Sequence, residues 1–178
     1  MWRFLSLWTA AALIGAAAPG APSELEEHQA KAVFLYKFAS FVEWPAEAFA
    51  AGTSPFSICV LGQSPVQEIL TVTVRDKNAA GRAFQIRAVE SARDASACQI
   101  LFVSAKGVRK FRALRPELSS ASLLTVGESD DFASHGGGIV NLKLQDGRIL
   151  LEINAASARQ ARLKINSRLL GMASLVAK

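Results

Sequence analysis

Three short apolar runs constrain the fold of this chain more than any other feature. They are Phe56–Gly62, Gln99–Ser104 and Ser122–Gly127. Each has the length and the continuous apolar character of a strand that is buried on both faces of a sheet. Amphipathic segments separate them, the clearest being Val108–Leu118. This alternation predicts an α/β fold with a mainly parallel, twisted sheet and helices on both faces.

The C-terminal part of the chain predicts an antiparallel addition to that sheet. Ile139–Leu144 and Ile149–Ile153 are joined through Gln145-Asp146-Gly147, and an Asp-Gly pair between two apolar runs is a strong hairpin signal. We therefore expect a C-terminal antiparallel hairpin at the edge of the sheet. Asn154 is expected to cap a final helix that continues to about Val176. With 178 residues, the chain has the length of one domain.

An acidic segment, Glu24–Glu27, opens the first predicted helix, and negative charge suits the first turn of a helix. Apolar side chains then recur at spacings of three and four, which predicts one buried stripe with the stem of Lys37 at its border. The stripe comprises Ala30, Val33, Phe34, Phe38 and Phe41. Lys31 and Tyr36 are expected on other faces of this helix. Further along the chain, Glu128–Phe132 is expected to be a solvated polar turn.

Residues 1–22 have the organisation of a secretory signal peptide. Met1-Trp2-Arg3 is a short positive start, Phe4–Ala18 is almost wholly apolar or small, and an Ala- and Pro-rich stretch follows. The apolar run is shorter than the ~20 residues that span a bilayer, although an N-terminal membrane anchor is the alternative. We expect cleavage between Ala17 and Ser23 and a single exported domain over residues 23–178.

Export, charge and motifs together exclude several classes of function. The formal net charge of +5 comes from scattered basic residues and is weak support for nucleic-acid binding. Export also removes the protein from nucleic acid and from cytosolic nucleotide cofactors. The two histidines, His28 and His135, have no partner at metal-ligand spacing, and no Walker A or G-x-G-x-x-G motif occurs. We therefore expect a protein that is not an enzyme and that needs no metal and no cofactor.

Two partial esterase motifs leave a hydrolase as an alternative. The segment from Gly62 to Ser64 begins like a nucleophile elbow, but Val66 stands where the second glycine belongs. The segment His135-Gly136-Gly137-Gly138 spells an oxyanion-hole loop, but no elbow follows it. A hydrolase would use Ser64 and His135, whereas the simpler interpretation of the glycine-rich segment is a flexible turn before a strand.

The chain has two cysteines, Cys59 within the first apolar run and Cys98 just before the second. Neighbouring strands of a parallel sheet can bring these positions together, and disulfides persist in exported proteins. Two separately buried thiols are the alternative, because a free cysteine packs as a small apolar side chain. Export favours the disulfide, which would close a loop of ~40 residues and stabilise the fold by roughly 4 kcal/mol.

Six motifs, taken in order, resemble one family of exported bacterial proteins. The most distinctive is Ala32–Pro45, a helix that ends in Trp-Pro. The others are Ile58–Gly62, Cys98–Val103, Leu124–Gly127, the pair Phe132-Ala133 with Gly137–Ile139, and Leu151–Asn154, followed by the closing segment Leu163–Leu170. They make the chain similar to the YfiR family, and this resemblance covers about residues 28 to 175.

This resemblance implies a periplasmic regulator with no catalytic activity. YfiR-like proteins bind the periplasmic sensor portion of an inner-membrane diguanylate cyclase and hold it inactive, so that cyclic di-GMP and biofilm formation fall. The family fold is α/β, and its members tend to dimerise. A family cysteine pair matches Cys59 and Cys98 and would act as a structural staple. A second pair is absent because Val126–Asn154 contains no cysteine, which puts redox switching through that pair in doubt.

The resemblance also places the regulatory surface near the C-terminus. Leu151–Lys178 contains five basic residues and no acid other than Glu152. We expect Glu152, Arg159 and Arg162 to lie on or beside the cyclase-binding face, although a solvated helix face is the ordinary explanation for such charges.

Two alternatives to a cyclase inhibitor stay open. Relatives of the family occur beside other membrane receptors, such as histidine kinases, and one of these could be the partner. The protein could also sense a small molecule, because ligands of parallel sheets bind at the carboxyl ends of the strands. Those ends lie here near Gly62, Ser104 and Gly127.

Overall fold

The larger sheet is built from the apolar runs of the sequence and the segments beside them. In the computed structural model, which describes residues 23–177, this sheet has eight strands. Their spatial order is β10 (Ser174–Leu175), β8 (Arg148–Ile153), β7 (Val140–Gln145), β6 (Leu124–Gly127), β5 (Ile100–Val103), β2 (Phe56–Leu61), β4 (Arg82–Val89) and β3 (Asn78–Ala79). A separate antiparallel pair joins β1 (Val42–Glu43) to β9 (Lys164–Ile165).

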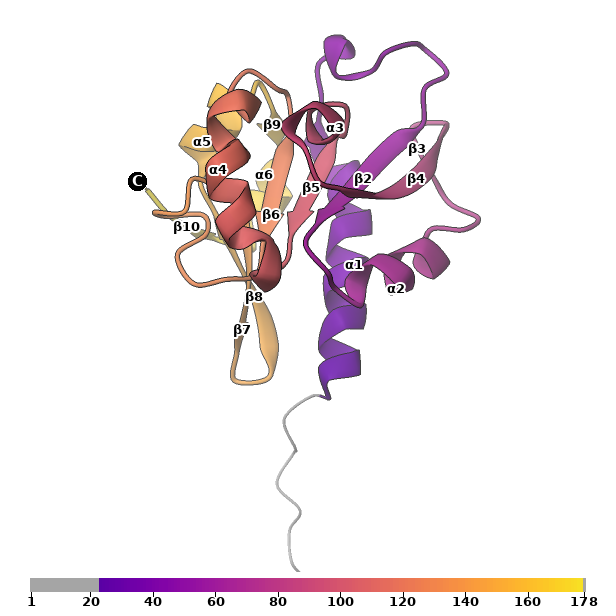
Figure 1. Cartoon of the computed structure of the whole chain (residues 1–178). Helices are drawn as coiled ribbons and strands as arrows, with labels where there is room; N and C mark the ends of the chain where they lie inside the picture. Colours follow the sequence, from indigo (N-terminus) through magenta and orange to yellow (C-terminus); the bar gives the residue numbers. More distant parts are fainter. Residues whose placement is uncertain (1–22, 178) are drawn as a thin grey trace, which may run out of the picture.

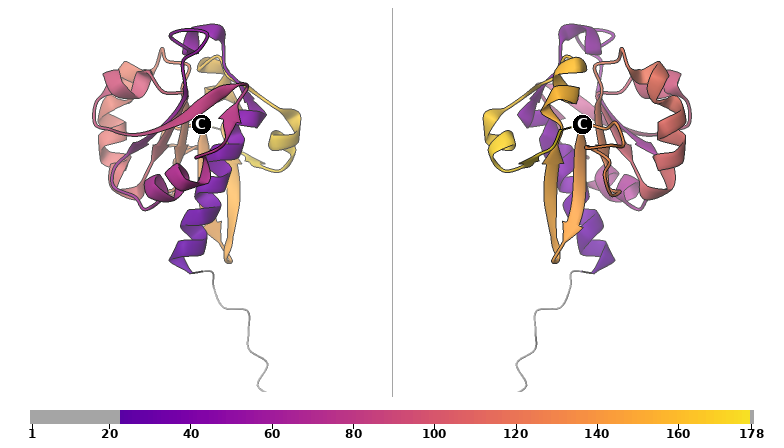
Figure 2. Two further views of the ribbon diagram at one scale, coloured as in Figure 1. Left: turned by 90° about the vertical axis from the view of Figure 1, so that its right-hand side faces the viewer. Right: turned by 90° about the vertical axis from the view of Figure 1, so that its left-hand side faces the viewer.

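Helices cover both faces of this sheet (Figure 1, Figure 2). On one face lie α1 (Glu24–Phe41) and α2 (Val66–Thr73), and on the other lie α3 (Ala92–Ser96) and α4 (Val108–Leu118). The chain also forms the short helices α5 (Ala155–Gln160) and α6 (Ser167–Gly171) and the 3-10 turns η1 (Ala46–Ala48) and η2 (Ala105–Gly107). No helix within residues 23–177 is long and apolar enough to cross a membrane. The predicted signal peptide, residues 1–22, lies outside the described residues.

The centre of the sheet is parallel, and its antiparallel pairs are the β7–β8 hairpin and, at the other edge, β3 with β4. β4, β2, β5, β6 and β7 run in one direction, and β7 turns back into β8. Asp146 and Gly147 have φ angles of 50° and 74°, the positive values that a tight hairpin turn requires. The predicted α/β fold is confirmed. One detail differs, because β10 pairs in parallel with the Glu152–Ile153 end of β8 and lies outside the hairpin.

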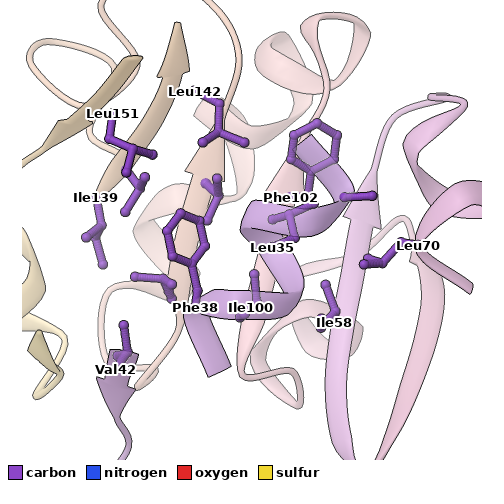
Figure 3. Close-up of a cluster of buried hydrophobic side chains, with 14 of the residues drawn as sticks. Leu35, Phe38, Val42, Ile58, Leu70, Ile100, Phe102, Ile139, Leu142 and Leu151 are labelled. Carbon is purple, nitrogen blue, oxygen red and sulfur yellow. The ribbon is translucent and has the colours of Figure 1, made fainter. Parts of the chain in front are cut away.

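The core consists of two apolar clusters, one on each face of the sheet. The larger cluster gathers Leu35 and Phe38 of α1, Leu70 of α2 and inward residues of the strands (Figure 3). Successive side chains of a strand point to opposite faces, so Ile58 joins this cluster while Cys59 joins the cluster under α3 and α4. The continuous burial of β2 that the sequence predicted therefore reflects a strand covered on both sides.

The buried face of α1 differs from the predicted stripe. The helix begins as expected, with Ser23 as N-cap in a capping box with Glu26. Its fully buried residues are Lys31, Ala32, Leu35 and Phe38, whereas Val33 and Lys37 are exposed. The predicted stripe is confirmed for Phe38 and in part for Phe34 and Phe41, which pack against the core. It is wrong for Val33, and it placed Lys31 on another face. In the structure, carboxylates form ion pairs with Lys31, and this compensation of its charge allows the face of α1 that carries Lys31 to be buried.

The single C-terminal helix predicted from Asn154 to about Val176 is wrong beyond its first turns. Asn154 does cap a helix, since its side chain accepts a hydrogen bond of 2.9 Å from the backbone N–H of Ser157. That helix ends at Gln160, and Arg162 takes a left-handed backbone conformation with φ 59°. β9, α6 and β10 follow in place of a continuous helix. The pairing of β9 with β1 offsets the loss of helical hydrogen bonds in this segment.

Candidate partner-binding surface

Exposed apolar side chains gather over the outer strands of the sheet. Leu144 and Leu150 lie on the β7–β8 hairpin, Met172 follows α6 and Leu175 lies on β10. Met172 and Leu175 are 59% and 62% exposed. Single exposed apolar residues are common on protein surfaces, but a group of them over adjoining elements is typical of a binding site. Leu144 lies opposite Ile149 on the face that α1 covers, whereas Leu150 lies on the other face of the hairpin. We therefore call the residues along the outer edge of β8, namely Ile149, Leu150, Met172 and Leu175, the outer-strand patch.

The outer edge of β8 is only partly covered. β10 pairs with Glu152 and Ile153, and among residues 23–177 no strand pairs with the outer side of Arg148–Leu151. The backbone N–H of Val176 donates to the carbonyl of Ile153, so this carbonyl points away from β7. Backbone groups alternate in direction along a strand, and the N–H and C=O of Ile149 therefore also point to the open side.

An apolar groove follows this open edge. It has a volume of about 170 Å³ and is lined by Phe34, Ile149, Leu150, Leu151, Met172 and Ser174. α1 runs beside the hairpin (Figure 1) and supplies the Phe34 wall. The open backbone and the apolar lining thus lie at the same place on the surface.

Glu152 lies at the closed end of this edge. Its carboxylate accepts a hydrogen bond of 3.0 Å from the side-chain amide of Asn141 and lies 3.9 Å from the Nζ atom of Lys143. Its Cα is in register with Ser174 of β10. Glu152 is half-buried, and these partners hold its side chain on the face opposite to Leu151.

Of the two predicted arginines, Arg159 lies on α5 and Arg162 lies just after it. Arg159 and Arg162 are both exposed. The guanidinium of Arg162 donates to the carbonyl of Ser120, 3.1 Å away, in the loop between α4 and β6. Within residues 23–177, no hydrogen bond or ion pair joins either arginine to Glu152. The structure therefore leaves both arginine side chains accessible without forming one cluster with the glutamate.

Cys59 and Cys98 are joined in a disulfide, with their Cα atoms 6.1 Å apart. Cys59 lies in the middle of β2, and Cys98 lies two residues before β5, the neighbouring strand. Both are buried in the cluster under α3 and α4. The side chain of Arg87, on β4 opposite Cys59, approaches the sulfur of Cys98 to 3.5 Å. The crosslink therefore ties the central strands together beneath α3.

Sequence reasoning missed a buried ionic cluster at the carboxyl ends of the strands. Lys31 of α1 pairs with Glu27, one turn earlier, and with Glu128, which directly follows β6. The Oε1 atom of Glu128 also accepts a hydrogen bond of 2.9 Å from the backbone N–H of Ala105. The i,i+4 spacing of Glu27 and Lys31 was the available signal. The predicted solvated turn at Glu128 is wrong for this residue, whose side chain is only 11% exposed.

The cluster keeps Lys31 charged. Burial lowers the pKa of Lys31, but the hydrogen bonds and negative charges of Glu128 and Glu27 outweigh it and raise the pKa above its ordinary value of 10.5. A charged ammonium group therefore links α1 to the segments after β5 and β6. This link holds α1 against the segments at the carboxyl ends of β5 and β6.

The glycines at the carboxyl ends of β2 and β6 are closely packed, and a pocket of about 430 Å³ lies just beyond the ends of β2 and β5, lined by residues that include Gln63, Ser64 and Lys106. A Cβ added to Gly62 would lie 2.5 Å from the Oγ of Ser104 and 2.6 Å from the backbone nitrogen of Gly107. A Cβ on Gly127 would lie 2.3 Å from the ring of Phe132. Ser104 donates to the carbonyl of Leu61 at 3.3 Å. These positions are packing contacts in the structure.

The residues of the alternative hydrolase serve local structure. The Oγ of Ser64 accepts a hydrogen bond of 3.3 Å from the backbone N–H of Val66 at the start of α2. His135 is exposed, and its Nδ1 lies 3.9 Å from the carboxylate of Asp131. Within the described residues, neither a hydrogen bond between Ser64 and His135 nor a group of three potential metal ligands occurs.

Comparison with known families decides the identity of the domain. A family model described as YfiR/HmsC-like matches residues 28–174. The chain belongs to the YfiR/HmsC-like family. No curated protein matches the sequence.

One solved structure resembles this YfiR/HmsC-like domain at the level of the fold. A conserved domain protein from Vibrio cholerae O1 biovar El Tor aligns with a TM-score of 0.51 and 14% identity, over 68% of this chain and 54% of that one. An ABC domain from Streptococcus pneumonia, solved in complex with L-Trp, aligns with a TM-score of 0.47 and 13% identity, over 84% and 60%. The YfiR/HmsC-like chain thus spans little more than half the length of either protein.

Proposed function

We propose that this YfiR/HmsC-like protein is a periplasmic regulator that binds the periplasmic sensor domain of an inner-membrane diguanylate cyclase and inhibits it. Lower cyclic di-GMP and weaker biofilm formation would follow. The outer-strand patch is the observation that carries the proposal, because it offers a partner an apolar surface with an open strand edge. The protein acts by binding, without catalysis and without a cofactor.

The chemistry of the patch suits a protein partner. Protein interfaces combine a central apolar area with a polar rim, and here Glu152, Lys143 and Arg148 border the exposed Leu150. Charged rims mainly set the rate and specificity of association. A surface of this kind supports reversible binding to a receptor domain, as a regulator requires.

The direct test is capture of the partner by the mature protein. We expect residues 23–178, used as bait on detergent-solubilised membranes, to retain a diguanylate cyclase, and we expect deletion of the gene to raise cellular cyclic di-GMP. An unchanged cyclic di-GMP level together with no retained cyclase would contradict the proposal. Retention of a histidine kinase instead would show that the same surface serves another membrane receptor, which is the second candidate function.

Charge reversal of the two exposed arginines tests whether the cyclase-binding face extends onto α5. We expect Arg159→Glu with Arg162→Glu to release inhibition of the cyclase while changing the free energy of unfolding by less than about 1 kcal/mol, because exposed charges contribute little to stability. Cyclic di-GMP in cells and thermal melting of the purified protein measure the two effects. The control is Arg109→Glu with Arg112→Glu, exposed on α4. Full inhibition by the folded α5 variant would place the interface elsewhere.

We further propose that the protein forms a homodimer through α1 and α2. A groove of about 550 Å³ lies between these helices, with exposed Val33 and Val72 on its walls. Acidic Glu68 lies on one wall of the groove, and the segment Arg75-Asp76-Lys77, with one net positive charge, follows the end of α2. A two-fold axis across the groove would bring Val33 and Val72 of the two copies together and bury these exposed apolar side chains.

Substitution at the centre of this groove tests the dimer. We expect Val72→Glu to raise the dimer dissociation constant at least tenfold, because it would bury two like charges at the two-fold axis. Thr71→Glu is the matched control, since Thr71 is the preceding exposed residue of α2. Sedimentation equilibrium over a range of concentrations measures both variants. A wild-type protein that stays monomeric at all soluble concentrations would refute the dimer.

A further inference from the structure

We infer that the open edge of β8 receives an extended segment of the cyclase's periplasmic domain, which pairs with Ile149 as an added strand of the sheet. This inference rests on the proposed function and specifies how the partner is held. The recognised chemistry is a backbone in β conformation with apolar side chains at alternate positions. Strand addition of this kind uses main-chain hydrogen bonds for affinity and side-chain pockets for specificity.

The backbone of β8 is prepared for such pairing. The carbonyl of Ile153 already accepts a hydrogen bond from Val176, which continues β10. The N–H and C=O of Ile149, four residues earlier, point to the same side of the strand by the alternation described above. β10 pairs only with Glu152 and Ile153, so an added strand would pair with Arg148–Leu151 and would lie against Met172 and Ser174, which line the groove where the chain enters β10.

The side chains around the edge define what the segment carries. The groove walls formed by Phe34, Leu150 and Met172 suit alternating apolar residues. At the start of the strand Arg148 is exposed and, within residues 23–177, forms no salt bridge. An acidic side chain on the added segment would complement it. An open apolar edge also favours unwanted association, and specific occupation by a partner strand removes that liability.

A second copy of this chain suits the edge less well. Two-fold pairing of two β8 edges would bring the Arg148 and Lys143 side chains of both copies into the same region, and like charges on neighbouring strands are unfavourable. The short length of the open edge and the presence of β10 also limit how far two copies could overlap. The complementary occupant is therefore an acidic and apolar segment of the cyclase.

The test separates backbone pairing from side-chain contact. Ile149→Pro removes the outward N–H of Ile149 and leaves the outward N–H of Leu151 in place, and proline is tolerated in edge strands where the N–H faces solvent. Ile149→Ala removes more of the side chain but keeps the N–H. Using the purified periplasmic domain of the captured cyclase as probe, we expect Ile149→Pro to weaken binding at least tenfold and Ile149→Ala to weaken it less than threefold. Circular dichroism and melting temperature verify the fold of each variant.

The other possible results distinguish failure of strand addition from failure of the proposed function. Equal weakening by the proline and alanine variants, or wild-type binding by a folded proline variant, would overturn strand addition and leave the proposed function intact. If Ile149→Pro changes only the oligomeric state, the occupant is a second copy and the inference is wrong. A wild-type protein that binds no cyclase domain would refute the proposed function itself. If the proline variant does not fold, Arg148→Glu should weaken binding while Arg148→Lys preserves it, and equal binding by both would overturn the inference.

Discussion

Replacing Lys31 by methionine is expected to lower the free energy of unfolding by about 3 kcal/mol, because removal of one member of a buried ionic group leaves the other charges uncompensated. Glu128 and Glu27 would then face each other without the ammonium group between them. Methionine has a similar length and an apolar stem, so loss of packing contributes little. Urea denaturation of the mature protein measures the change.

Two further variants separate the ionic cluster from the general effect of removing a lysine. Lys37→Met, on the same helix at an exposed position, should change the free energy of unfolding by less than about 0.5 kcal/mol. Adding Glu128→Gln to Lys31→Met should recover part of the loss, because glutamine can still accept the hydrogen bond from Ala105 without leaving a buried charge. Equal effects of Lys31→Met and Lys37→Met would show that the cluster contributes nothing.

The cluster also predicts how the free energy of unfolding depends on pH. The pKa of Lys31 is raised in the folded protein above the ordinary 10.5. A group with a raised folded pKa contributes its full stabilisation below the unfolded pKa and loses it as the pH rises through the folded pKa. The difference in stability between the wild type and Lys31→Met should therefore be constant near neutral pH and become smaller above pH 10.5.

The parts of the fold that follow a simple periodicity were predictable. β2, β5, β6 and α4 lie where the apolar runs and the amphipathic segment placed them, with α4 over Val108–Leu118. The hairpin followed from the Asp-Gly turn, since both turn residues take the backbone conformation that this pair favours. Local propensity and tertiary packing agree in these segments.

The errors arose where distant contacts override the local pattern. The buried face of α1 depends on Glu128, which lies 97 residues after Lys31 in the chain, and no helical periodicity contains that information. The C-terminal helix breaks because the segment after Gln160 pairs as β9 with β1 and then as β10 with β8. For the candidate site, the charged residues could be identified in the sequence. The open edge of β8 could not be predicted, because it depends on β10 being two residues long and pairing with one end of β8.

Loss of the crosslink between Cys59 and Cys98 is expected to destabilise the exported protein by roughly 4 kcal/mol. The cysteines are 39 residues apart in the chain, and a crosslink over a loop of ~40 residues restricts the unfolded chain by about that amount. For a domain of this size, the melting temperature should fall by about 10 °C on reduction. Mass spectrometry of the unreduced protein should show a peptide in which the two residues are linked.

The comparison with Cys59→Ala/Cys98→Ala identifies the crosslink as the cause. Reductant should lower the melting temperature of the wild type but leave that of the double variant unchanged, because the variant has no disulfide to reduce. Both cysteines are buried between β2, β5 and α3, in a cluster that contains no residue of the outer-strand patch. The reduced protein should therefore still bind the cyclase at temperatures where it remains folded. Modification of both cysteines by a thiol reagent in the oxidised, native protein would refute the disulfide. Loss of cyclase binding by a reduced but folded protein would show instead that the crosslink controls the binding surface directly and does not act through stability alone.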